Sequence, residues 1–264
     1  MISVTSAQLN AWLAAFAWPF VRILALVASA PILGNPSIPL RVKIGLSFAV
    51  SIILVPILGA MPQVEPGSAI GLLILAQQIV IGVAMGFAMR IIFTAVEMAG
   101  QIIGSQMGLG FATFFDPQNA AQTPVLGQFL GMISTLAFLA MNGHLLMIEV
   151  LAQSFQALPV MAQPFAATGW RAFVGWGKEI FLAGLLLSMP IMAALLITNL
   201  ALGVMTRAAP QLNVFSVGFP ITLAAGFVVL IVALPYFSPV LVRLLHDGAE
   251  MALQVVRLAR PVVP

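Results

Sequence analysis

Long apolar runs, separated by short polar or proline-rich breaks, make up most of the chain. The six longest are residues 11–33, 44–60, 69–89, 125–148, 180–206 and 221–242. Two of these runs, 69–89 and 180–206, carry no charge over 21 and 27 residues. Because a helix needs about 20 apolar residues to cross the hydrocarbon core of a bilayer, the pattern predicts an all-α membrane protein with about six long apolar helical segments.

Prolines interrupt several of these runs at interior positions, namely 19, 31, 56, 190, 235 and 239. A proline inside a helix removes one backbone hydrogen bond and kinks or breaks the helix. We therefore expect several of the segments to be broken. The chain has no repeat of fixed period and no low-complexity linker, which predicts a single helical domain over residues 1–264.

The composition excludes two large classes of protein. Of the 264 residues, 62% are hydrophobic and only 6% are charged, whereas about 25% are charged in soluble domains, so the charges are too few to cover a water-soluble globule. Ten Lys and Arg residues are scattered along the chain. Nucleic-acid-binding domains instead cluster their basic residues, so no nucleic-acid partner is expected. No basic residue precedes Arg22, and no cleaved signal peptide is expected.

Nothing in the sequence resembles a catalytic, cofactor or metal site. The chain contains no cysteine and only two histidines, His144 and His246, which lie far apart and lack metal-ligand spacing. Gly177-Lys178-Glu179 lacks the preceding glycine and the Ser/Thr of a phosphate-binding loop. We expect no catalytic residue, cofactor or metal, and His144 fits a structural histidine better than a proton relay.

The stretch from Gly100 to Pro124 combines three unusual features. Gly100, Gly104 and Gly108 are four residues apart, so on a helix they share one face that lets another backbone approach closely. A glycine and three phenylalanines follow, at Gly110, Phe111, Phe114 and Phe115, and then the turn signal Asp116-Pro117. A polar patch comes next, at Gln118, Asn119, Gln122 and Thr123. Two interpretations remain open. The stretch is either a tight helix pair with a connecting loop, or a loop that lines an aqueous path, where a bilayer tolerates irregular backbone.

Among the few charged residues inside apolar sequence, Arg22 and Asp116 are the most informative. A mid-segment arginine such as Arg22 costs about 2.5–3.5 kcal/mol on insertion scales, so we expect its side chain to face protein or water rather than lipid. Asp116 either forms a proton or ion site or simply begins the turn before Pro117.

The last part of the chain, residues 243–260, has an amphipathic helical pattern. Its polar positions recur every three or four residues, at Arg243, His246, Asp247, Glu250, Gln254 and Arg257. The opposite face is apolar, with Leu244, Leu245, Met251, Ala252, Val255 and Leu258. We expect this helix to lie on a surface or to dock onto a partner.

Three stretches, taken in order, resemble one family. Arg22 to Lys43 contains Arg, then Pro-x-x-Gly, then Pro-x-Arg-x-Lys, and Gly100 to His144 contains spaced glycines, Asp-Pro and Asn-Gly-His. The most specific stretch is RAAPQLNVFSVGFP, with Arg207, Pro210, Asn213, Gly218 and Pro220. In order and spacing they resemble the flagellar biosynthetic protein FliR family, including its counterparts in type III secretion.

The resemblance implies a structural rather than an enzymatic role. Members of this family form the flagellar export gate with several copies of FliP and FliQ, while FlhB wraps the cytoplasmic entrance, and unfolded secreted proteins pass through the pore. The gate lies in the bacterial inner membrane within the flagellar basal body, and its subunits are broken helical hairpins. The family's pore plug falls on Gln106 to Gln122 here, including Gln106, Met107, Gly108, Gly110, Phe111, Phe114, Phe115, Asp116 and Pro117.

Three rival functions remain. The chain is alternatively an export-gate subunit of a virulence-type secretion system, a secondary transporter or channel, or an assembly scaffold without pore contact. Broken helices and mid-segment charges also occur in transporters. Against a transporter stand the missing internal repeat and the near absence of intramembrane acids besides Glu97 and Asp116.

Overall fold

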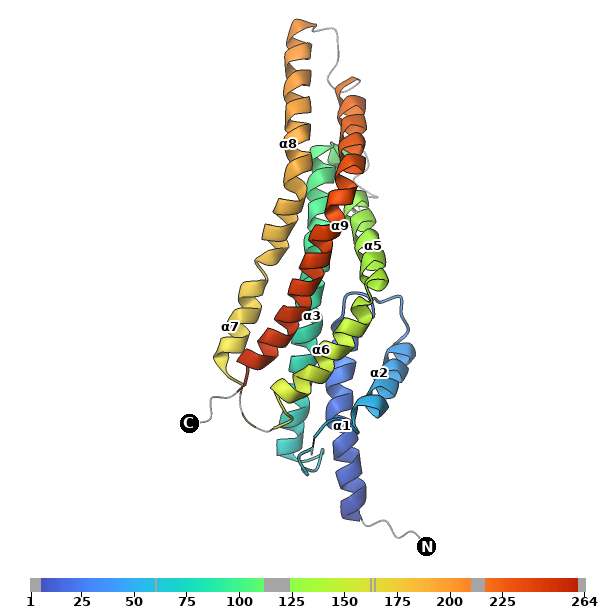
Figure 1. Cartoon of the computed structure of the whole chain (residues 1–264), viewed down its shortest axis with the longest axis vertical. Coiled ribbons are helices and arrows are strands. Elements are labelled where there is room, and N and C mark those ends of the chain that lie inside the picture. Colours follow the sequence, from blue (N-terminus) through green and yellow to red (C-terminus); the bar gives the residue numbers. More distant parts are fainter. Residues whose placement is uncertain are drawn as a thin grey trace. The chain divides into compact units, whose positions relative to one another are not determined.

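The computed structural model describes residues 6–59, 61–111, 124–161, 163, 165–209 and 217–260. All regular structure in these ranges is helical. In chain order (Figure 1), the elements are α1 (Ser6–Ser29), α2 (Leu40–Leu54), α3 (Ala69–Gln106), the 3-10 turn η1 (Leu109–Phe111), α5 (Val125–Ala140), α6 (Gly143–Ala157), α7 (Ala167–Trp176), α8 (Glu179–Ala208) and α9 (Phe219–Leu258).

The helices have the length and composition of membrane helices, which confirms the all-α membrane fold. Within the described residues, three stretches are long and apolar enough to cross a bilayer: Ala69–Gln106, Ala167–Ala208 and Phe219–Leu258. The number rises to four if α5 and α6 together form one broken span. The expected count of about six is not confirmed. One reason is local, because Asn142 adopts a left-handed conformation (φ 56°) and divides the apolar run 125–148 into two helices.

The chain divides into two compact units. Unit 1 comprises Met1–Ile91, Asn142–Gly177 and Leu245–Pro264, and unit 2 comprises Ile92–Met141 and Lys178–Leu244. The boundaries fall inside α3 and α9, so each of these helices contributes one part to each unit. The expected single domain over residues 1–264 stays a prediction.

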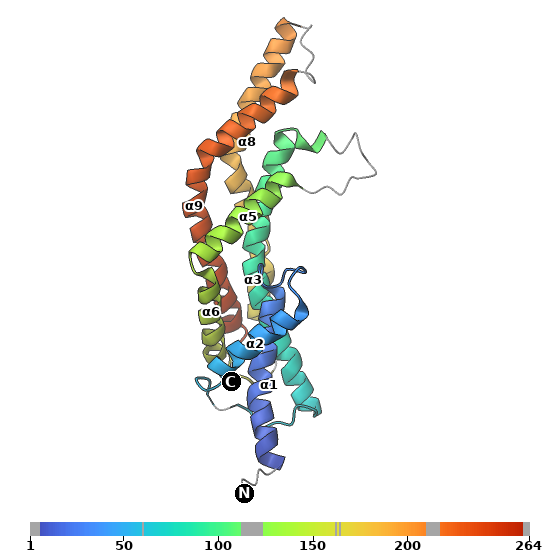
Figure 2. The same ribbon diagram turned by 90° about the vertical axis from the view of Figure 1, so that its right-hand side faces the viewer.

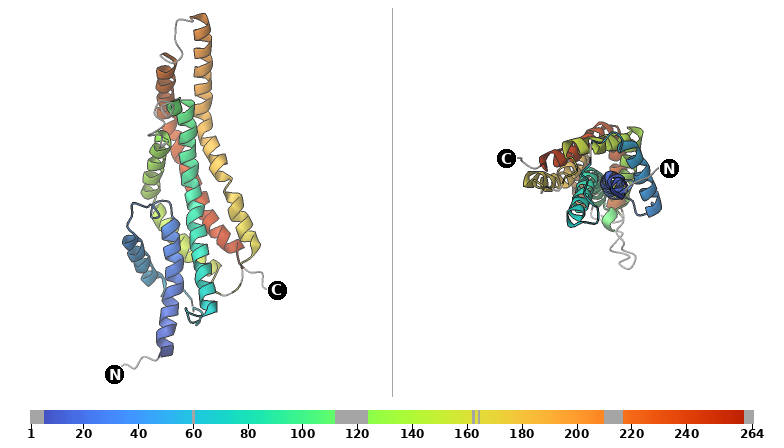
Figure 3. Two further views of the ribbon diagram at one scale, coloured as in Figure 1. Left: turned by 180° about the vertical axis from the view of Figure 1, so that it is seen from behind. Right: turned by 90° about the horizontal axis from the view of Figure 1, so that it is seen from below.

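Unit 1 is built around the close packing of α1 on the first part of α3, which lie side by side in Figure 3. A Cβ atom on Gly82 would clash with the backbone oxygen of Arg22, and one on Gly86 would clash with Ser29. These two glycines therefore let the helix backbones approach more closely than larger residues would allow. The core of this unit includes the fully buried Trp18, Ile23, Ile74, Met85, Leu151 and Leu158.

Unit 2 is built around the second part of α3, onto which three helices pack through glycine. Gly127 of α5 lies against Gly100, and a Cβ on Gly184 of α8 would lie 3.1 Å from the backbone oxygen of Ala95. A Cβ on Gly226 of α9 would lie 2.5 Å from Cγ of Met107. Small residues at each crossing are typical of helices that associate in a membrane.

The C-terminal amphipathic stretch is the end of α9 rather than a separate helix. The helix runs from Phe219 to Leu258 without interruption at Pro235 or Pro239. Its polar stripe is largely exposed, while Leu245, Ala252 and Val255 are buried. We expected the apolar face to meet a surface or a partner, but most of it packs within unit 1, where a Cβ on Gly169 of α7 would lie 2.8 Å from the backbone oxygen of Val255, while Leu258 is 39% exposed.

Candidate functional site

A buried arginine joins three segments of unit 1. Arg22 of α1 is fully buried, and its Nε donates a 2.8 Å hydrogen bond to Oε1 of Gln78 on α3. One terminal nitrogen donates to Oγ of Ser154 at 3.2 Å, and the other donates to the backbone oxygen of Leu158 at 3.0 Å. The guanidinium also lies over the ring of Phe155, 4.1 Å from its centroid. We call these five residues the arginine node.

The arginine node satisfies a buried cation with neutral groups. Leu158 is the C-cap of α6, and Ser154 lies in the last turn of that helix. The carbonyl groups at a helix C-terminus lack intrahelical partners and carry a partial negative charge. A guanidinium placed there offsets part of its desolvation cost, and its contact with the Phe155 ring adds a cation–π attraction. Arg22 therefore fastens α1 and α3 to the end of α6.

A second glutamine on α3 holds the chain just beyond α6. Nε2 of Gln77 donates a 2.9 Å hydrogen bond to the backbone oxygen of Gln163. Neither glutamine was predicted as a site residue from the sequence, although one signal was available. Gln77 and Gln78 are the only polar side chains in the apolar run 69–89, and a polar pair in such a run needs partners inside the protein.

The spaced glycines have three different environments in the structure. A Cβ on Gly100 would lie 2.6 Å from Cα of Gly127, whereas one on Gly104 would make only ordinary contacts, the nearest at 3.7 Å. Gly108 lies beyond the end of α3, with a positive φ of 87°. The three do not form one helix face as expected, because a glycine in this left-handed conformation ends a helix.

The end of α3 is fixed in unit 2 by Met107. Its side chain is fully buried and packs where a side chain on Gly226 of α9 would otherwise lie. Gln106 is half-buried, Gly110 is exposed, and Phe111 closes the 3-10 turn. Phe114, Phe115, Asp116 and Pro117 lie outside the described residues, as do the other positions in 112–123.

The family motif after α8 is only partly described. Arg207 is exposed in the last turn of α8, while Gly218 is buried just before α9. Pro220 lies in the first turn of α9, where a helix tolerates proline because the first backbone N–H groups have no intrahelical acceptor. Pro210 and Asn213 lie outside the described residues.

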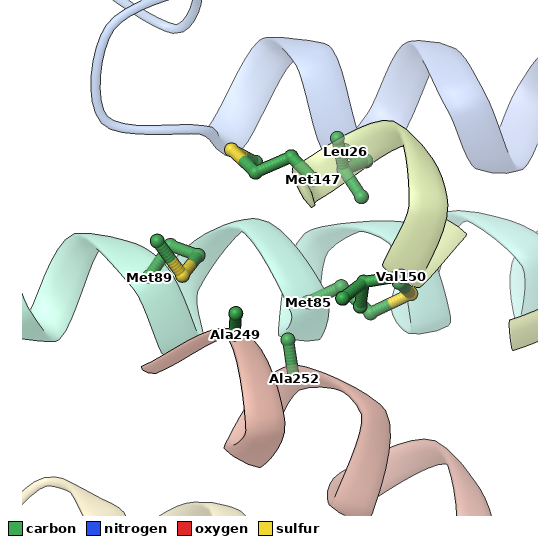
Figure 4. Close-up of a pocket in the computed structure, with 7 residues that line it drawn as sticks. All are labelled: Leu26, Met85, Met89, Met147, Val150, Ala249 and Ala252. Atoms are coloured by element: carbon green, nitrogen blue, oxygen red, sulfur yellow. The ribbon is translucent and has the colours of Figure 1, made fainter. Parts of the chain in front are cut away.

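A small apolar cavity in unit 1 offers no polar group to a ligand. Its volume is about 10 Å³, and the residues that line it come from α1, α3, α6 and α9 (Figure 4). The lining residues are Leu26, Met85, Met89, Met147, Val150, Ala249 and Ala252. A space of this size is at the lower limit for a single water molecule, so it is a packing void. Among the described residues, no group of three or more His, Cys, Asp or Glu side chains could hold a metal ion.

Comparison with known proteins places most of the chain in one group. Residues 13–248 match the family model for bacterial export proteins, family 1. The flagellar biosynthetic protein FliR of Escherichia coli K12 is 44% identical over 239 residues, which cover 90% of this chain and 91% of the relative. FliR of Pectobacterium carotovorum is also 44% identical with the same coverage. FliR of Bacillus subtilis is 34% identical and covers 83% of this chain and 86% of its own length.

Proposed function

Since the chain belongs to the FliR family of bacterial export proteins, we propose that it is a non-enzymatic subunit of the flagellar protein export gate. It assembles with FliP and FliQ around the pore through which unfolded flagellar subunits leave the cell, and FlhB and other export-apparatus proteins adjoin it. It is located in the bacterial inner membrane, within the flagellar basal body. The observation that carries this proposal is the 44% identity to FliR over nine-tenths of the chain.

The exposed apolar residues of unit 2 support the proposal that the chain packs against other subunits. On α8, Ile197 is 69% exposed and Leu200 is 71% exposed, and on α9 Ile231 is 70% exposed. Apolar surfaces of this extent mark contacts with lipid or with other subunits. In the assembled gate, FliP and FliQ would cover these exposed residues.

The gating part of the proposal concerns Gln106 to Gln122, which we call the plug segment. Described residues at its start and after its end are held within unit 2: Met107 packs on Gly226, and the first turn of α5 packs on α3 where Gly127 meets Gly100. The two helices that flank the segment therefore belong to one packed unit. The bulky apolar side chains of Phe111, Phe114 and Phe115 would fill a constriction and exclude water, as hydrophobic gates do.

Co-purification tests the assembly. The full-length chain carrying an affinity tag is expressed alone and together with FliP and FliQ, and each detergent extract is analysed by size-exclusion chromatography. We expect a single complex containing all three proteins and a heterogeneous sample of the chain alone. A thermally stable, monodisperse chain that does not retain FliP or FliQ would contradict the proposal.

Bilayer conductance of the assembled complex tests the plug segment separately. Deletion of Gly110 to Asp116 should make the closed complex leak small ions. A matched variant replaces the same residues with an equal number of glycines and serines, which keeps the length but removes the phenylalanine side chains, and it should leak as well. If both variants assemble and remain as tight as the parent, the segment is only a connecting loop.

A further inference from the structure

Helix α2 of unit 1 buries small polar residues and exposes large apolar ones, which is the reverse of a helix that faces water. Figure 2 shows α2 lying across α1, and the contact includes an edge-to-face pair between Phe16 and Phe48, with ring centroids 5.1 Å apart. The residues that α2 buries are Ser47, Ser51 and Leu54. The large residues that it exposes are Leu40, Val42, Ile44, Leu46, Phe48, Ile52 and Ile53.

The two buried serines satisfy their own hydroxyl groups. Oγ of Ser47 donates a 2.7 Å hydrogen bond to the backbone oxygen of Lys43, and Oγ of Ser51 donates one of 2.6 Å to the backbone oxygen of Ser47. This back-bonding to the preceding turn needs neither water nor another helix. The inner face is therefore complete, and an amphipathic helix in water would turn its aliphatic side inward instead. The outer face of α2 requires an apolar neighbour.

The charges of α2 show the kind of neighbour that fits. Arg41 and Lys43 lie in its first turn, and no acidic residue precedes Glu65 in the sequence. Cations at a helix N-terminus are not stabilised by the helix dipole, and an anionic phosphate beside them would offset that unfavourable interaction. The helix is about 22 Å long at 1.5 Å per residue, shorter than the hydrocarbon core of a bilayer, about 30 Å. Its cations therefore reach one membrane interface only.

We propose that α2 is a lipid-binding surface for anionic phospholipid. Its outer face lies on acyl chains, while Arg41 and Lys43 bind the headgroup phosphate at the same interface. This inference rests on the membrane fold and not on the export-gate function. The alternative neighbour is an apolar helix of another protein, for which the exposed small residues Gly45 and Ala49, four apart, would form the closest approach.

The absence of cysteine from the chain permits a clean labelling experiment on the full-length protein, free or in its complex. A spin label at Ile53→Cys, in vesicles containing phosphatidylglycerol, should be relaxed much more by oxygen than by a water-soluble nickel chelate. A label at Gln63→Cys, in the exposed loop after α2, should show the reverse preference. Free access of the chelate to position 53, or protection from both reagents, would overturn the proposal.

Headgroup selectivity is measured with a fluorophore at Leu40→Cys and brominated lipids as quenchers. Brominated phosphatidylglycerol should quench several-fold more effectively than brominated phosphatidylcholine, and Arg41→Gln with Lys43→Gln should remove that difference. The control variant Arg257→Gln, in the last turn of α9, should preserve it. Equal quenching by the two lipids in the parent, or selectivity retained in the double variant, would refute the anionic site.

A third measurement separates lipid from a protein neighbour. Enlarging the small outer residues by Gly45→Leu and Ala49→Leu should leave the yield of folded protein and of any complex unchanged, because acyl chains rearrange around a larger side chain. A Cβ on Gly45 meets no atom within 4 Å, so the chain itself tolerates the change. Loss of complex with retained folding would identify a protein partner on this face and reject the lipid assignment.

Discussion

Gly100 of α3 and Gly127 of α5 cross so closely that a Cβ on Gly100 would lie 2.6 Å from Cα of Gly127. The obstacle is backbone, which cannot move aside as the end of a flexible side chain can. This crossing holds together the two helices that flank residues 112–123. It therefore fixes these two helices against each other in unit 2.

Substitution of this glycine should be costly, while substitution of its neighbour one turn later should not. Gly100→Ala would force the two helices apart, and overpacking of this kind costs about 1–3 kcal/mol. Gly104→Ala meets its nearest atoms at 3.7 Å, and alanine favours the helix by up to about 1 kcal/mol over glycine. Thermal unfolding of the purified protein measures both. A lower midpoint for Gly104→Ala than for Gly100→Ala would contradict this description of the crossing.

Removal of the buried cation should destabilise unit 1 without blocking membrane insertion. Arg22→Leu leaves Oε1 of Gln78 and the backbone oxygen of Leu158 without their donor, and each hydrogen bond to a charged group contributes about 1.5–3 kcal/mol. We expect a markedly lower unfolding midpoint and a lower yield of complex, with normal amounts of membrane-inserted protein. Arg257→Leu removes an exposed arginine and serves as the control. Normal complex yield and normal motility with Arg22→Leu would show that the node is dispensable.

The left-handed residue at the end of α3 should accept asparagine but not valine. Gly108 has φ 87°, and a side chain raises the energy of this conformation by roughly 1–2 kcal/mol. Asparagine is enriched there and valine is not. We expect Gly108→Val to lower protein export at normal complex yield, and Gly108→Asn to retain most of it. Equal export by the two variants would mean that the conformation of this residue is unimportant for function.

The two faces of the last part of α9 should differ strongly in their tolerance of charge. Leu245 is 2% exposed. Leu245→Asp places a carboxylate there without a partner, which should lower the free energy of unfolding by roughly 3 kcal/mol or more. Gln254 is exposed, so Gln254→Asp should be nearly neutral. Protease resistance of the membrane-inserted protein reports the difference, and motility should follow it. Equal effects would show that the buried face has been assigned wrongly.

The sequence by itself determined the class of protein and the family. The scarcity of charge and the length of the apolar runs led to an all-α membrane fold, because no aqueous fold can cover so much apolar surface. The resemblance of three motifs to FliR is confirmed by the match over residues 13–248. The polar and apolar positions of residues 243–258 were also readable, since helical periodicity is a local property.

Only the tertiary structure decided which distant residues meet and where helices end. The hydrogen-bond partners of Arg22 lie 56, 132 and 136 residues away in sequence, and no local pattern relates such positions. The break at Asn142 and the end of α3 before Gly108 depend on left-handed backbone, which only these two of the described residues adopt. The apolar periodicity of Leu245, Ala252 and Val255 predicts a buried face. It does not indicate whether another protein or the same chain covers that face. The packing of the last part of α9 within unit 1 settled that choice, because burial depends on the sum of many long-range contacts and not on the period of the sequence.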